Sequence, residues 1–254
     1  MNAQDLRSAL SDIIGEQYVL TDHTAVFAYS QDASHFGGTD AAVVVRPGTT
    51  EEVSAIMKFA SRHTIPVVVR GGGTSIYGQP KGTPGANILI DMTRMNQVIH
   101  IDPKAMTVTT QAGIIMGKLQ QACNQAGYYV FAPAGPLHSV SIGGWLSGVA
   151  GGGGIWWETI GMTVVLPDGT VVTTGGGPGT NVKQKHAYSR VIGGPDFSGM
   201  FIGDGGSLGI KTEVSIRLLG LPSVTRGCIL EFTRLEDVME LLRKHGERVN
   251  PHPC

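Results

Sequence analysis

The run RGGGTSIYG at residues 70–78 combines residue types that can bind an anion, and it directly follows the apolar segment PVVV. Consecutive glycines let the backbone turn sharply and adopt positive φ angles, so that successive N–H groups can converge on one negative group. Thr74 and Ser75 add hydroxyl donors, and Arg70 adds a fixed positive charge. The loop fits a diphosphate; the alternative is a glycine turn at a strand end that binds nothing.

Two further glycine-rich segments point to a ligand that is contacted from several sides. Residues 133–154 read PAGPLHSVSIGGWLSGVAGGGG, and residues 203–210 read GDGGSLGI. Small residues let a flat ligand or a second backbone approach closely. His138 lies within the first of these segments, where it could act as a base, donate to the ligand, or simply bond to the backbone. Three such loops at strand ends predict one extended ligand.

The common nucleotide-binding motifs do not match this sequence. The Rossmann spacing G-x-G-x-x-G would need a glycine where Ile76 stands. Gly113–Leu119 (GIIMGKL) has the wrong spacing for a P-loop, and no hydroxyl residue follows Lys118. A phosphate site here therefore belongs to another architecture.

The elements before the first glycine loop predict a βαβ unit. Val43–Arg46 is a β-branched run, and Pro66–Arg70 is apolar on both faces, as in a fully buried strand. Between them, Thr50–His63 has a helical apolar period and a threonine cap at Thr49 or Thr50. Such a unit makes 43–45 and 67–69 parallel neighbours. The helix's predicted buried face is Val53, Ile56, Met57 and Ala60.

The rest of the chain alternates between predicted strands and helices. The turn Pro167-Asp168-Gly169 should join two alternating strands, and Gly127 should end a helix. The predicted strands are 87–91, 106–111, 163–166, 170–174, 213–219 and 227–233, and the predicted helices are 114–126 and 235–245, besides a short amphipathic helix at the N-terminus.

Composition bounds the class of protein. The chain has 254 residues, 37 of them glycine, with 15% charged residues and a net charge of −1. The near-neutral charge gives no case for nucleic-acid binding, and no run of 18 apolar residues predicts a membrane span. Three scattered cysteines without a C-x-x-C pair predict neither a disulfide framework nor a metal site. Without a secretory leader pattern, a cytoplasmic location is expected.

Five ordered motifs resemble the FAD-linked oxidases of the vanillyl-alcohol oxidase and p-cresol methylhydroxylase type. Nearest are the FAD subunit of glycolate oxidase and the D-2-hydroxyacid dehydrogenases. The motifs are VVRPGTTEEV at 44–53, PVVVRGGGTSIYG at 66–78, SIGGW at 141–145, VVLPDG at 164–169 and SLGIKTE at 207–213. The resemblance implies an α/β (α+β) FAD-binding domain over 41–220, with subdomains of about 41–95 and 96–220. A helical segment, 1–40, would precede it, and 221–254 would be a cap remnant or a partner-docking tail.

The resemblance also implies which residues hold the cofactor. Gly71–Ser75 would wrap the FAD pyrophosphate, and Gly161 and Ile210 would lie along the ribityl and adenosine portions. Members with covalent flavin often carry histidine where Thr74 stands, so FAD is expected to be noncovalent. The expected cofactor-binding residues are Arg70, Gly71, Gly72, Gly73, Thr74, Ser75, Gly78, Pro133, Ala134, Gly135, Ser139, Ile142, Gly143, Gly144, Ser147, Gly161 and Ile210.

The resemblance implies a dehydrogenase that passes hydride from a 2-hydroxy acid to flavin N5. The cap domain of such proteins usually carries the substrate-binding and catalytic residues, and none can be assigned here. We therefore expect a partner, either an iron–sulfur subunit or a cap-domain protein, that completes the site. The alternatives are an electron-transfer flavin module without a substrate of its own and an FAD-free scaffold. His252 and Cys254 have no assigned role.

Overall fold

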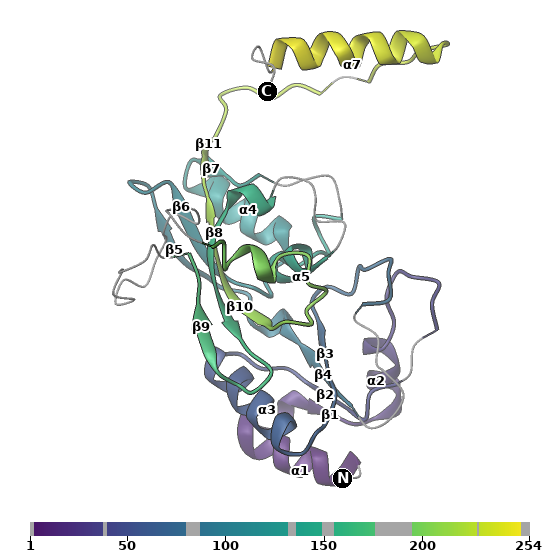
Figure 1. Ribbon diagram of the computed structural model, residues 1–254, viewed down its shortest axis with the longest axis vertical. Helices are drawn as coiled ribbons and strands as arrows, with labels where there is room; N and C mark the ends of the chain where they lie inside the picture. Colours follow the sequence, from purple (N-terminus) through teal and green to yellow (C-terminus); the bar gives the residue numbers. More distant parts are fainter. Residues whose placement is uncertain are drawn as a thin grey trace. The chain divides into compact units, whose positions relative to one another are not determined.

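The computed structural model describes residues 3–37, 40–79, 87–131, 136–148, 155–175, 195–227 and 229–249. Its contacts divide the chain into two units, Met1–Leu221 and Pro222–Cys254. The larger unit contains two main sheets (Figure 1), one with three parallel strands and one antiparallel throughout. This confirms the predicted α/β (α+β) class. The finer boundaries of the segments and subdomains stay predictions.

The first sheet has the strand order β1-β2-β4-β3. It is made of β1 (Val19–Leu20), β2 (Val43–Val45), β4 (Ile88–Asp91) and β3 (Val67–Arg70). The prediction that 43–45 and 67–69 are neighbours is wrong, because β4 pairs in parallel with both of them. The central place goes to β4, whose side chains are all buried. The edge strand β3 is only half-buried, which corrects the prediction of full burial.

Helices cover both faces of this sheet (Figure 1). On one face, α1 (Ala3–Ile14) and α3 (Thr50–Arg62) pack with the side chains of Val43, Val45 and Ile88. On the other, α2 (His23–Tyr29) places Val26 beside Val44 and Leu89. The alternation of side chains along each strand accounts for the two layers.

The predicted start and buried face of α3 are confirmed. Thr49 caps the helix, and its Oγ1 accepts a hydrogen bond from the backbone N of Glu52 at 3.1 Å. Glu52 in turn accepts from the backbone N of Gly48 at 2.6 Å. The first bond satisfies an amide that the first helical turn leaves free, and the second ties the chain before the cap to the helix. The four apolar residues that were expected inside are buried: Val53, Ile56, Met57 and Ala60.

The second sheet has the order β5-β6-β10-β8-β9 and is antiparallel throughout. Its strands are β5 (Val98–Asp102), β6 (Thr107–Gln111), β10 (Ile210–Arg217), β8 (Thr159–Val165) and β9 (Val171–Thr173). The predicted turn between β8 and β9 is confirmed, with Gly169 at a φ of 84°. Helices α4 (Met116–Gln125) and α5 (Ile142–Ser147) share a core with this sheet. Gly127, at a φ of 84°, follows α4 as expected.

The larger unit also has several short elements. They are η1 (Glu16–Tyr18), η2 (Met92–Arg94), α6 (Ile155–Glu158), η3 (Gly199–Phe201), and the strand pair β7 (Tyr128–Tyr129) and β11 (Leu219–Gly220).

The smaller unit contains α7 (Leu235–Val249), which confirms a helix there and extends it beyond residue 245. The predicted strand at 227–233 is wrong, because residues 227 and 229–233 have no strand structure. A strand forms only where another strand pairs with its N–H and C=O groups. The described residues of this unit contain no such partner strand. None of the described helices of the chain combines the length and apolar character needed to cross a membrane.

Candidate cofactor-binding site

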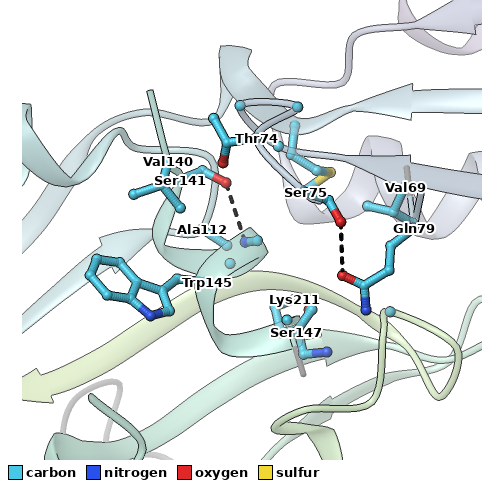
Figure 2. Close-up of a pocket in the computed structure, with 18 of the residues that line it drawn as sticks. Val69, Thr74, Ser75, Gln79, Ala112, Val140, Ser141, Trp145, Ser147 and Lys211 are labelled. Atoms are coloured by element: carbon cyan, nitrogen blue, oxygen red, sulfur yellow. Dashed lines mark hydrogen bonds between the residues drawn. The ribbon is translucent and has the colours of Figure 1, made fainter. Parts of the chain in front are cut away.

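A cavity of about 370 Å³ lies where the three glycine-rich segments meet. The loop after β3, the segment with α5, and the loop before β10 all contribute to its wall. Figure 2 shows Thr74 and Ser75 on one side of this cavity and Ser147 and Lys211 on the other. The predicted cofactor-binding residues that line it are Gly71, Gly72, Gly73, Thr74, Ser75, Gly143, Gly144, Ser147 and Ile210. Segments far apart in the sequence thus form one site.

Backbone hydrogen bonds fix the second glycine segment against the second sheet. Ser141 caps α5, and its Oγ accepts from the backbone N of Gly144 at 3.2 Å. The backbone N of Gly143 donates to the carbonyl of Ala112 at 2.8 Å. A Cβ on Gly143 would stand 2.9 Å from that same oxygen, so a glycine lets the helix start this close to the strand end.

The third segment is hydrogen-bonded to the end of the second. The backbone N of Gly203 donates to the carbonyl of Leu146 at 2.7 Å. The backbone N of Gly205 donates to the carbonyl of Ser147 at 2.8 Å. These two bonds hold the loop before β10 beside α5, so that both can face the cavity.

The first loop lies directly on the second segment. A Cβ on Gly72 would be 1.6 Å from the carbonyl oxygen of Ser139, and one on Gly71 would be 2.0 Å from Ser141 Oγ. No side chain fits at either distance, so these two glycines are needed for the contact between the loops. Gly73 is needed for a different reason. Its φ is 68°, a backbone conformation that glycine adopts more readily than other residues.

Arg70 lies behind the first loop and is not among the residues that line the cavity. Its guanidinium donates to the carbonyl of Gln31 and lies against the Cα of Gly73, where a Cβ would meet it at 2.0 Å. Burial lowers the pKa of Arg70, and the carboxylates of Asp91 and Asp32 oppose that shift. Arg70 therefore supports the loop through its contacts with Gln31 and Gly73.

The remaining expected residues that the structure describes are not among those that line the cavity. Ile142, the first residue of α5, is buried in the core, and Gly161 in β8 lies against the carbonyl of Thr174. Gly78 and Ser139 flank the lining segments without lining the cavity. Pro133, Ala134 and Gly135 lie outside the described residues, as do His252 and Cys254. The cofactor contacts of all these residues stay predictions.

His138 lies beside α4, apart from the main cavity. With Leu137 and polar residues of the helix it lines a separate cavity of about 460 Å³. A Cβ on Gly117 would be 3.1 Å from its Nδ1. This position favours the interpretation of His138 as a loop residue over that of a base at the main cavity.

The sequence reasoning missed a buried ion pair at the cavity. Lys211 Nζ contacts Asp204 Oδ1, and the side chains are only 2% and 1% exposed. Burial lowers the pKa of Lys211, and Asp204 opposes that shift. Asp204 also accepts from the backbone N of Gly206 at 2.9 Å, which ties the pair to the glycine loop. The sequence carried no clear signal for this pair, because β10 reads IKTEVSIR and Lys211 stands there among other polar residues.

The lining suits a dinucleotide such as FAD. Bare glycine backbone offers N–H groups, Thr74, Ser75 and Ser147 offer hydroxyls, and Val69, Ala112 and Trp145 offer apolar surface. Such a combination is typical of cofactor cavities, in which few polar groups orient a mostly apolar ligand. No cluster of His, Cys, Asp or Glu that could hold a metal occurs within the described ranges.

Comparisons with known proteins agree with this chemistry. The family described as FAD binding domain matches residues 41–175, more than half of the chain. The glycolate oxidase subunit GlcD of Bacillus subtilis is 27% identical over 242 residues, which cover 93% of this chain and 49% of that protein. D-2-hydroxyglutarate dehydrogenase of Stutzerimonas stutzeri is 29% identical over 245 residues, which cover 95% and 51%.

A structural neighbour extends the agreement to the fold. A crystal structure of p-cresol methylhydroxylase with substrate bound superposes with a TM-score of 0.67 at 23% identity, over 87% of this chain and 44% of that one. The chain therefore spans about half the length of the relatives named here. The expected family resemblance and the expected cofactor, FAD, are confirmed, and the chain belongs to the FAD binding domain family.

Proposed function

We propose that this chain is the FAD-binding subunit of a flavin-dependent dehydrogenase that oxidises a 2-hydroxy acid. The observation that carries the proposal is the convergence of three glycine segments on one cavity in a chain of the FAD binding domain family. The substrate class comes from the relatives, whose names include a glycolate oxidase subunit and a D-2-hydroxyglutarate dehydrogenase. A cytoplasmic location stays a prediction.

The residues of the cavity divide into those that bind charge and those that bind a flat ring. Gly71–Ser75 would hold the diphosphate through backbone N–H groups and hydroxyls. The small residues Gly143, Gly144 and Ser147 would let the flavin and ribityl portions lie on α5. When bound, noncovalent FAD supplies a two-electron acceptor that takes hydride from the substrate Cα at N5, while a base takes the hydroxyl proton.

The base for that proton is proposed to come from a partner. Among the described residues that line the cavity there is no histidine, aspartate or glutamate, and Lys211 is the one charged side chain. The lysine is already paired with Asp204. A cap-domain protein or an iron–sulfur subunit would complete the site. The apolar side chains of Leu235, Met239 and Leu242, exposed along α7 at helical spacing, support 221–254 as a docking tail.

The test is anaerobic reduction of the bound flavin, which is measured as the loss of its visible absorbance. D-lactate, glycolate and D-2-hydroxyglutarate are added to the purified chain and to the chain with its co-purifying subunits, with propionate, which has no 2-hydroxyl group, as the control. We expect at least one of the acids to bleach the flavin, and only in the preparation that contains the subunits. Bleaching of the isolated chain would contradict a base supplied by a partner. No bleaching by any 2-hydroxy acid in either preparation would contradict the substrate class.

That no histidine, aspartate or glutamate is among the described lining residues also favours a second candidate, an electron-transfer flavin module. Such a module would exchange electrons with an iron–sulfur or flavin subunit and would have no substrate of its own. In the same experiment its flavin would be reduced by the reduced partner subunit and by none of the acids.

A further inference from the structure

Lys211 is a buried cation on the wall of the cavity. Its side chain is 2% exposed, and it is the one charged side chain among the described lining residues. A buried ammonium is costly unless it is paired, and Asp204 supplies one partner. An ammonium has three N–H donors, and Asp204 is its one hydrogen-bond acceptor among the described residues. Two donors thus have no acceptor among the described residues, and Lys211 is one of the residues that line the cavity.

The position of this cation relative to the first glycine loop suggests what it binds. Asp204 and Lys211 flank the loop 205–210, and a Cβ on Gly205 would lie 3.3 Å from Nε2 of Gln79. The Oε1 of the same Gln79 accepts from Ser75 Oγ at 3.3 Å. The third segment thus approaches the end of the loop that carries the hydroxyl donors. In Figure 2 Lys211 lies across the cavity from Thr74.

We propose that Lys211, oriented by Asp204, binds the diphosphate of FAD from the wall opposite Gly71–Ser75. The glycine loop offers neutral N–H and hydroxyl donors, and Arg70 lies behind it and off the cavity lining. A diphosphate carries two negative charges, which the neutral donors solvate but do not balance. Lys211 supplies charge-assisted N–H donors at the cavity, and Asp204 fixes the direction of the ammonium. The inference rests on FAD as the ligand of this cavity.

The test uses the apoprotein and three probes: FAD, ADP and adenosine. Lys211→Met is made together with Asp204→Asn, so that no buried carboxylate is left unpaired, and is compared with Asp204→Asn alone. The dissociation constants of FAD and ADP should rise by about 10- to 100-fold, because each probe loses a charge-assisted hydrogen bond. That of adenosine, which has no phosphate, should not change. Lys211→Arg keeps a cation and should recover part of the affinity. Lys104→Met, on an exposed turn, is the matched control and should bind all three probes as the wild type does.

Several results would overturn the proposal. Unchanged FAD and ADP affinity in the double variant, relative to Asp204→Asn alone, would refute it while leaving FAD binding intact. An equal loss for adenosine and ADP would show that Lys211 only packs the loop. If the double variant does not fold, the comparison of ADP with adenosine in Lys211→Arg decides, since a phosphate-binding lysine predicts a loss for ADP alone. A wild-type apoprotein that binds no FAD would instead contradict the proposed function.

Discussion

The carbonyl oxygen of Ser139 lies 1.6 Å from the position that a Cβ atom on Gly72 would occupy. Two glycine-rich segments, 67 residues apart, therefore touch through bare backbone. The anion-binding loop and the segment that leads into α5 hold each other in place, so the cavity's shape depends on the absence of a side chain at this point.

Gly72→Ala should abolish stoichiometric FAD binding, because a methyl group at 72 must push the loop away from residue 139. Overpacking of this kind costs about 1–3 kcal/mol of unfolding free energy. Thermal unfolding and the ratio of flavin to protein absorbance measure the two effects. Gly220→Ala, where nothing lies within 4 Å of the added Cβ, is the matched control and should leave both values near the wild type. Full FAD occupancy in Gly72→Ala would refute the loop contact.

Thr49→Ala should lower the unfolding free energy by about 1 kcal/mol, since the hydroxyl caps α3 through the amide of Glu52. The measurement is urea unfolding followed by far-ultraviolet circular dichroism. Ser61→Ala, at an exposed position of the same helix, serves as the control. Equal stabilities of the two variants would contradict the capping role.

Arg70→Met should destabilise the apoprotein, because the side chain braces the loop from behind through Gln31. A hydrogen bond from a charged group contributes about 1.5–3 kcal/mol. The melting temperature of the apoprotein should therefore fall, and FAD affinity should fall with it. An unchanged melting temperature with a strong loss of FAD affinity would instead indicate direct contact with the cofactor, as the sequence suggested.

Cys123 should resist alkylation in the folded protein. Burial raises its pKa from 9.0 to about 11, so the reactive thiolate is scarce at pH 9. The shift favours the neutral thiol in the folded state, so its contribution to stability is present below pH 9 and is lost as the pH rises through 11. Peptide mass spectrometry after iodoacetamide treatment at pH 9 should show at least tenfold slower labelling than in guanidinium. Equal rates would contradict the buried position.

Local signals in the sequence were enough to predict most elements of the larger unit. The apolar period and cap of α3 and the turn at Gly169 are short-range patterns, and both are confirmed. Strand order is a long-range property. Nothing local distinguishes β3 from β4 as the central strand, so β4 was not expected between β2 and β3. The failed strand at 227–233 has a related cause, because a strand exists only where another strand pairs with it.

For the candidate site too, local features were predictable from the sequence, whereas the directions of individual side chains were not. The three glycine segments were recognisable because glycine is needed where backbones approach closely, and they do line one cavity. Arg70 was expected at the ligand, but its direction depends on the fold around Gln31. Lys211 was missed because a lone lysine in a strand has no sequence signal for burial. Such roles depend on which face of a strand meets the cavity.

The most direct test of the whole account is the flavin content of the purified chain. We predict a yellow protein with about one FAD per chain, released in full by acid because Thr74 offers no histidine for covalent attachment of the flavin. A protein that is colourless and whose apo form takes up no FAD in a fluorescence titration would contradict the assignment of the cavity. Flavin that stays on the polypeptide after acid precipitation would contradict noncovalent binding.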